Sequence, residues 1–168
     1  MRYRGHLSFG VLAFLVGIPL IAVSVLAIAI AFYEGRKAYW DSEVRKMCEK
    51  DGGMVILERV PISEAEAKTL PRGDGRLGVA VKELAAPSAP VYAESKKVIL
   101  RDSDPTVSRT EYVVIRRSDR KVVARWVYYA RGGGDFPTYA HPSSFGCPDL
   151  RQITSDQAQL FVLEEGSR

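Results

Sequence analysis

The chain has 168 residues, with 24 Lys or Arg against 20 Asp or Glu, and its formal net charge at neutral pH is +4. Arg2 and Arg4 precede a long apolar stretch, which leaves 22 basic against 20 acidic residues, a net charge of +2, in the remainder. This near-balance, with the basic residues scattered along the chain, argues against nucleic acid as a partner. The roughly 135 residues after the apolar stretch suffice for one domain with its own core.

The apolar stretch, residues 7–33, contains no charged side chain and exceeds the roughly 20 residues that a helix needs to cross a bilayer. Because lipid offers the backbone no hydrogen-bond partner, such a stretch must be helical inside a membrane. A cleaved export signal is the alternative, since Ala29-Ile30-Ala31 resembles a cleavage site. The apolar core of an export signal is typically about 7–15 residues long, which favours an uncleaved single-pass anchor within residues 1–33.

Small residues recur along one side of this predicted helix at alternating spacings of three and four residues. Small side chains let membrane helices approach closely, so the stripe predicts packing against a membrane-protein partner or a second copy of the chain, with lipid elsewhere. The alternative is chance, because glycine is frequent in membrane helices generally. Pro19, in the same span, predicts a kink. The stripe comprises Gly10, Ala13, Gly17, Ser24, Ala27 and Ala31, with Leu20 as its one large member.

Cys48 and Cys147 are the only cysteines in the sequence. A disulfide between them would close a loop of about 100 residues and would persist only in an oxidising compartment. Two unrelated thiols are the alternative. The pairing predicts an exported domain, periplasmic or extracellular, with a cytoplasmic N-terminus. Basic residues lie on both sides of the span, so the positive-inside rule does not decide the orientation.

Beyond the span, the spacing of apolar residues predicts a juxtamembrane helix over residues 34–52, ended by a pair of glycines. A buried strand is expected at residues 54–60, with Pro61 as its end. The segment Ser63-Glu64-Ala65-Glu66 has the pattern of a capping box and predicts a short helix over residues 63–70. The segments that follow are a loop at residues 71–75, a short strand at residues 77–84 and a proline-stiffened connector at residues 85–90.

The strongest strand signal comes from β-branched and aromatic runs at residues 91–101, 107–117 and 121–131. The last two form a predicted hairpin across Ser118-Asp119-Arg120. Arg120 stands there at a position that favours glycine, so the sequence predicts strain in this turn.

These elements predict an α+β fold, in which a single transmembrane helix is extended by the juxtamembrane helix and followed by a small antiparallel sheet domain. The domain, residues 53–148, is expected to contain one short helix and to end in coil from residue 132. The tail, residues 149–168, is expected to form either a short helix or an edge strand. Three aromatic residues on the last long strand are candidates for contact with a partner or ligand: Trp126, Tyr128 and Tyr129.

The sequence motifs predict neither catalysis nor a metal or cofactor site. Arg72-Gly73-Asp74 matches an adhesion tripeptide, but turn chemistry explains all three residues. Gly132-Gly133-Gly134-Asp135 lacks the Lys-Ser/Thr pair and the helix of a phosphate-binding loop. His141 lacks the surrounding motif of a hydrolase, and with the two cysteines it forms too small a set for a metal site.

Four short segments of the sequence form a recognisable combination: Cys48-Glu49-Lys50-Asp51-Gly52-Gly53, Arg117-Ser118-Asp119, Arg131-Gly132-Gly133-Gly134-Asp135 and His141-Pro142-Ser143-Ser144-Phe145-Gly146-Cys147-Pro148. In combination they resemble a group of small bacterial proteins whose N-terminus is a membrane anchor or an export signal. The string H-P-S-S-F-x-C-P is the most specific part of this resemblance. The resemblance implies a bacterial origin and an exported domain, and it transfers no activity.

Two functions from different classes are consistent with this sequence. The first is a non-catalytic accessory or structural subunit of a bacterial membrane protein complex. Such a subunit would be anchored once in the inner membrane, with its N-terminus cytoplasmic and its periplasmic domain docked on a partner. The second is a free-standing envelope module that binds a small ligand or cell-wall component. An envelope hydrolase that uses His141 has the least support.

Overall fold

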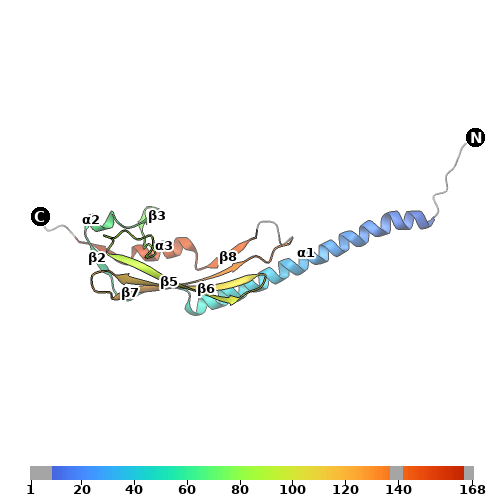
Figure 1. The fold of residues 1–168 in the computed structure, drawn as a ribbon. Helices are drawn as coiled ribbons and strands as arrows, with labels where there is room; N and C mark the ends of the chain where they lie inside the picture. The colour runs from blue at the N-terminus through green and yellow to red at the C-terminus, as the bar shows by residue number, and fades with distance from the viewer. Residues whose placement is uncertain (1–8, 137–141, 165–168) are drawn as a thin grey trace, which may run out of the picture.

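The computed structural model describes residues 9–136 and 142–164, with side chains from residue 17 onward. One long helix leads into a sheet domain, which we call the head and which comprises the described residues from Gly53 on. The molecule is elongated, and the helix projects from one end of the head (Figure 1). The α+β fold predicted from the sequence is confirmed.

Helix α1 spans Phe9–Asp51, so the predicted transmembrane and juxtamembrane helices are one continuous element that runs unbroken through Pro19. Its apolar portion is long enough to cross a membrane, and none of that portion is buried against the head. The helix ends where Gly52 donates its N–H to the carbonyl of Cys48 over 2.7 Å. Gly53 follows with φ +102°, a backbone conformation that glycine adopts at little cost.

The main sheet is antiparallel, with the strand order β1-β7-β6-β5, and β8 pairs with β7 beyond this path. The three long strands lie where the sequence predicted them. Residues 144–147 correct the prediction of coil over residues 132–148, because their backbone completes the pairing of β7. The strand bounds are β1 Gly53–Ile56, β5 Val91–Arg101, β6 Thr106–Arg116, β7 Val122–Gly132 and β8 Ser144–Cys147.

Each side of the sheet covers a different core. Tyr112 of β6 pairs with Trp126 of β7, and both side chains lie on one side of the sheet, which we call the α3 side. The neighbouring pair, Glu111 and Val127, lies on the opposite side, which we call the α1 side. The C-terminal part of α1 covers the α1 side at the end of the head nearer the span (Figure 1). The larger core lies on the α3 side, and Val114 and Trp126 belong to it.

The smaller elements cap this larger core. Strand β2 (Val60–Ile62) pairs in parallel with β9 (Phe161–Leu163). Helix α2 (Glu64–Ala67) begins with the predicted capping box, in which Ser63 and Glu66 bond each other reciprocally. Helix α3 (Leu150–Ala158) precedes β9, so the tail forms both of the expected alternatives in succession. Ile153 of α3 and the following Leu160 are buried, and the head therefore continues past residue 148.

The predicted strand at residues 54–60 is divided between two sheets. Leu57 and Glu58 both direct their N–H groups to the carbonyl of Val123, and the chain then leaves β7. Pro61 lies inside β2 rather than ending it, which is possible because its exposed position requires no ladder donor.

The predicted strand at residues 77–84 is also much shorter. Strand β3 (Arg72–Gly73) pairs with β4 (Arg76–Leu77) across Asp74 and Gly75, which have φ +49° and +75°. This two-residue turn has the left-handed backbone that Asp-Gly favours, and it accounts for the adhesion-like tripeptide. In the other hairpin, Arg120 has φ +60°, as its position in the predicted turn implied.

Candidate functional site

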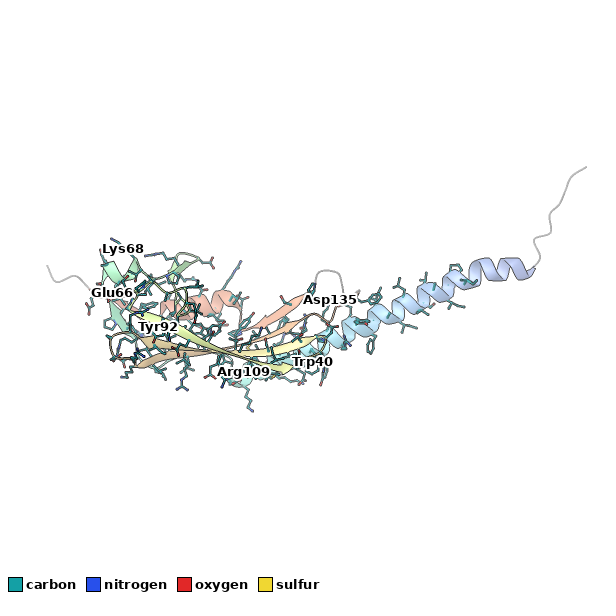
Figure 2. The ribbon with its side chains drawn as sticks, viewed as in Figure 1. Trp40, Glu66, Lys68, Tyr92, Arg109 and Asp135 are labelled. Carbon is teal, nitrogen blue, oxygen red and sulfur yellow. A yellow bond between two sulfur atoms is a disulfide. The ribbon has the colours of Figure 1, made fainter. Side chains whose placement is uncertain are left out.

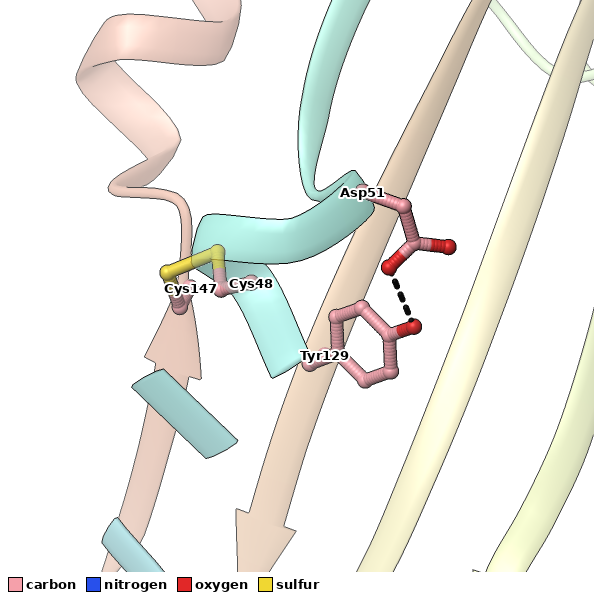
Figure 3. Close-up of a disulfide and its surroundings, with 4 residues drawn as sticks. All are labelled: Cys48, Asp51, Tyr129 and Cys147. Carbon is pink, nitrogen blue, oxygen red and sulfur yellow. Dashed lines mark hydrogen bonds between the residues drawn. A yellow bond between two sulfur atoms is a disulfide. The ribbon is translucent and has the colours of Figure 1, made fainter. Parts of the chain in front are cut away.

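The C-terminal turns of α1 pack on the α1 side of the sheet and form a second, smaller core. Val44 is fully buried there, in one cluster with Val107 of β6 and Val127 of β7. One turn further, Cys48 is disulfide-bonded to Cys147 of β8, with their Cα atoms 6.0 Å apart (Figure 3). We call the contact between the head and residues 33–51 of α1 the junction.

A hydrogen-bonded cluster closes the junction at the end of α1. The hydroxyl of Tyr129 donates to Asp51 over 2.6 Å (Figure 3). Arg109 donates to Asp51 over 3.2 Å, to the Tyr129 hydroxyl over 3.2 Å and to Glu111 over 3.0 Å. The hydrogen bond from Tyr129, and then those from Arg109, hold the pKa of Asp51 below its usual range. Burial, followed by the bond to Asp51, raises the pKa of Tyr129.

The depressed pKa of Asp51 predicts that the junction weakens in acid. A carboxyl whose pKa is lowered by folding stabilises the folded state above its unfolded pKa of about 3.9, and this contribution is lost as the pH falls through the folded value. Tyr129→Phe removes the hydrogen bond that is the largest cause of the lowered pKa of Asp51. We expect it to lower the free energy of unfolding at neutral pH by about 1 kcal/mol and to flatten its decline below about pH 4.

Urea unfolding of the full chain in mild detergent, measured across pH, tests this expectation. Tyr39→Phe is the matched control, because Tyr39 is 57% exposed on α1, the helix that carries Asp51, and the chemical change is identical. An unchanged profile for Tyr129→Phe relative to the control would contradict the role given to the Asp51 bond.

Arg131 is the central residue of the junction and is only 2% exposed. Its Nε donates to Asp41 of α1 over 2.6 Å. One of its terminal nitrogens donates to the Ser143 carbonyl and hydroxyl, over 3.2 and 3.1 Å, and to the carbonyl of Gly133. A single buried guanidinium thus bonds the helix, the segment after β7 and the segment before β8, and its charge is balanced by Asp41.

Two aspartates extend these contacts toward the span. Asp135 accepts a hydrogen bond from the N–H of Ser143 over 2.6 Å and forms an ion pair with Lys37 of α1 at 3.3 Å. The bond from Ser143 is the main cause that lowers the pKa of Asp135. Asp104, between β5 and β6, accepts the N–H of Gly134 over 2.6 Å and pairs with Arg36 at 2.9 Å. Figure 2 shows Asp135 beside α1, where the helix leaves the head.

These contacts give a structural role to the string Arg131–Asp135 and to Ser143, for which the sequence patterns predicted none. Charged residues rarely lie fully buried, so the pattern of β7 alone did not indicate that Arg131 turns inward. The signal was its place at the end of a strand, before three glycines and an aspartate. What the arrangement achieves is a fixed attachment of the helix to the head.

The three predicted contact residues do not share one surface. Trp126 is 6% exposed and stacks on Tyr112 in the larger core, with ring centroids 4.5 Å apart. Tyr128 lies half-buried on the same side of the sheet, close enough to Gly146 that a side chain there would collide with its hydroxyl. Tyr129 is 5% exposed and lies on the opposite side, within the junction.

The other predicted site residues are placed as follows. Ser24, Ala27 and Ala31 of the small-residue stripe are exposed on α1, and Gly17 has open space around it. Gly10 and Ala13 lie in α1, but their surroundings are outside the described part of the structure, and His141 is outside the described residues altogether. Among the described residues, no group of three or more His, Cys, Asp or Glu side chains is arranged to hold a metal ion.

Comparison of the chain with protein-family models, with curated proteins and with solved structures finds no match. The resemblance to small bacterial membrane-anchored proteins therefore remains a prediction.

Proposed function

We propose that this chain is a non-catalytic accessory subunit of a bacterial membrane protein complex, anchored once in the inner membrane with its head in the periplasm. The observation that carries this proposal is that α1 passes from the apolar span into the head as one unbroken helix. A disulfide and the buried Arg131–Asp41 pair then fix it to the sheet. Such a rigid attachment suits a subunit that holds its head at a set position above the membrane.

The exported location of the head is supported by the disulfide, since such a bond persists in oxidising compartments and is rare in the cytosol. A single apolar N-terminal helix is consistent with a membrane anchor. With the head periplasmic, Arg2 and Arg4 lie on the cytoplasmic side, as the positive-inside rule favours for a short N-terminal segment.

The head offers an open sheet edge for a partner. Residues 94–100 of β5 are exposed on both sides of the sheet, and Val98, Ile99 and Leu100 are 40%, 47% and 47% exposed. At the start of the same edge, Ala93 already bonds a neighbouring segment through its outward N–H and C=O groups. The alternation of an antiparallel ladder directs the corresponding groups of Ser95 and Lys97 outward as well. We infer that an extended segment of the partner subunit pairs with this edge.

Proline substitution separates docking from folding on this edge. Lys97→Pro removes an outward N–H, which edge strands tolerate, whereas Lys96→Pro removes an N–H directed at β6. In mild detergent, we expect Lys97→Pro to lose its stoichiometric partner while the head keeps its stability. The matched Lys96→Pro should destabilise the head by about 1–3 kcal/mol, because it leaves an acceptor of β6 without its ladder hydrogen bond. Retention of the partner by Lys97→Pro would contradict docking at this edge.

The small-residue stripe provides a second contact with the complex, inside the membrane. Ala27→Leu places a large side chain on the stripe, and Ala29→Leu makes the same change on nearly the opposite side of the helix. We expect only Ala27→Leu to weaken the assembly that co-purifies from membranes or to disperse it in a membrane association assay. Equal behaviour of the two variants would contradict packing through the stripe.

The alternative, a free-standing binding module, is supported by an open depression of about 550 Å³ at the end of the head away from the span, lined in part by Arg116 and Arg117. Both guanidinium groups are already engaged. Arg116 bonds Glu58 and Asp119, and Arg117 donates to the carbonyl of Ala89. The subunit proposal is therefore the better supported of the two, and a binding module would purify without stoichiometric companions.

A further inference from the structure

We infer that the head makes its own contact with the membrane, through Phe136 inserted in the lipid interface beside the anchor. This inference rests on the anchoring of α1 proposed above. Its ligand is a lipid surface, and its site is the pair of rings formed by Phe136 of the head and Tyr33 of α1.

The geometry of the junction places Phe136 at the level of the last uncharged turn of α1. Its ring packs on Tyr33, with centroids 5.2 Å apart, and remains 40% exposed. The preceding residue, Asp135, pairs with Lys37, which lies four residues and therefore about 6 Å further along the helix axis. From Asp135 to Phe136, the chain of the head therefore runs from the charged residues of the junction toward the apolar span of α1.

The depth of Tyr33 and Phe136 in the bilayer follows from the length of the span. The uncharged stretch ends at Tyr33 and is followed by Glu34. At 1.5 Å per residue, residues 9–33 of α1 extend about 38 Å, which exceeds a hydrocarbon core of about 30 Å and reaches into the interfacial layers of the bilayer. Tyr33 therefore lies in the interfacial layer, where aromatic rings with a polar tip are favoured. Phe136, held against it, lies in the same layer.

Arg36 and Lys37, the basic residues next to this layer, have ion-pair partners within the protein, whereas Nε of Arg36 is buried without a hydrogen-bond partner among the described residues. Arg36 pairs with Asp104 and lies over the rings of Phe32 and Tyr33, at 5.8 and 5.1 Å from their centroids. Phe32 is itself 62% exposed, so three aromatic rings and one paired guanidinium form a patch suited to lipid headgroups. With two points of contact, the anchor and Phe136, the head has a fixed tilt on the membrane.

Fluorescence quenching by brominated lipids tests this inference on the full chain in proteoliposomes. The test variant is Phe136→Trp, which exchanges one exposed aromatic ring for another. Leu26→Trp, in the apolar span, reports insertion of the anchor into the bilayer. Leu84→Trp, at a position of the head that is 80% exposed, is the control for a tryptophan surrounded by water. Each signal is taken relative to the unmodified chain, which supplies the background of Trp40 and Trp126.

We expect Phe136→Trp to lose about half of its added fluorescence with lipids brominated near the headgroup, where interfacial rings lie. Leu26→Trp should be quenched more strongly by lipids brominated deep in the chains, and Leu84→Trp should be unaffected. Quenching of Leu26→Trp without quenching of Phe136→Trp would overturn the inference and leave the anchor intact. If Leu26→Trp is not quenched either, the anchoring itself fails and this inference with it.

Discussion

Replacement of both cysteines by alanine is expected to lower the free energy of unfolding of the head by about 4 kcal/mol, the largest effect that we predict for any change in this chain. Cys48 and Cys147 are 99 positions apart, so their bond restricts almost the whole head in the unfolded state. In the folded state, the same bond holds the last turn of α1 against the edge strand β8.

Urea unfolding of the full chain in mild detergent, followed by tryptophan fluorescence, measures this loss. The wild type after reduction is a useful companion sample, since it loses the bond without losing the sulfur atoms that fill the smaller core. We expect the free energies of unfolding of the double variant and the reduced wild type to agree to within about 1 kcal/mol. A loss below about 1 kcal/mol for the double variant would show that the disulfide does not stabilise the junction.

Arg131→Met is expected to cost about 3 kcal/mol, because it leaves Asp41 without its partner in a largely buried position. The variant also leaves the carbonyl groups of Gly133 and Ser143 without this donor. We expect the segments on both sides of residues 137–141 to lose hydrogen-exchange protection as well, since Arg131 bonds both.

Arg125→Met is the matched control for this prediction. Arg125 lies on the same strand, is exposed, and should change stability by less than about 0.5 kcal/mol. A double-mutant cycle with Asp41→Asn then isolates the coupling between the two side chains. Similar losses for Arg131→Met and Arg125→Met would contradict the central position that the structure gives to Arg131.

The sequence predicted the elements whose signals are local. The long apolar helix, the three long strands and the Ser63–Glu66 capping box all depend on residue spacing within one segment, and all are present. Local signals do not reveal pairing between distant segments. β8 and β9 are short, and each exists because a partner strand completes its hydrogen bonds, so they were expected as coil or left ambiguous.

The junction was only partly predictable for the same reason. The disulfide could be predicted, because two cysteines at the ends of one domain are obvious partners for each other. Arg131 and Asp41 are 90 positions apart and belong to residue types that usually face water. The aromatic residues of β7 were predicted as candidate contacts, and strand alternation sends Tyr128 and Tyr129 to opposite sides of the sheet. The local pattern did not show that Trp126 and Tyr129 are both buried.

We propose that the apolar helix remains in the membrane and carries a disulfide-bonded head as one rigid unit. Intact mass spectrometry of the protein, taken separately from the membrane and the soluble fractions of cells, tests both parts of this proposal. We expect a single species in the membrane fraction that retains residues 7–33 and has the mass of the disulfide form. A soluble species that lacks this segment, or a membrane species with two free thiols, would contradict it.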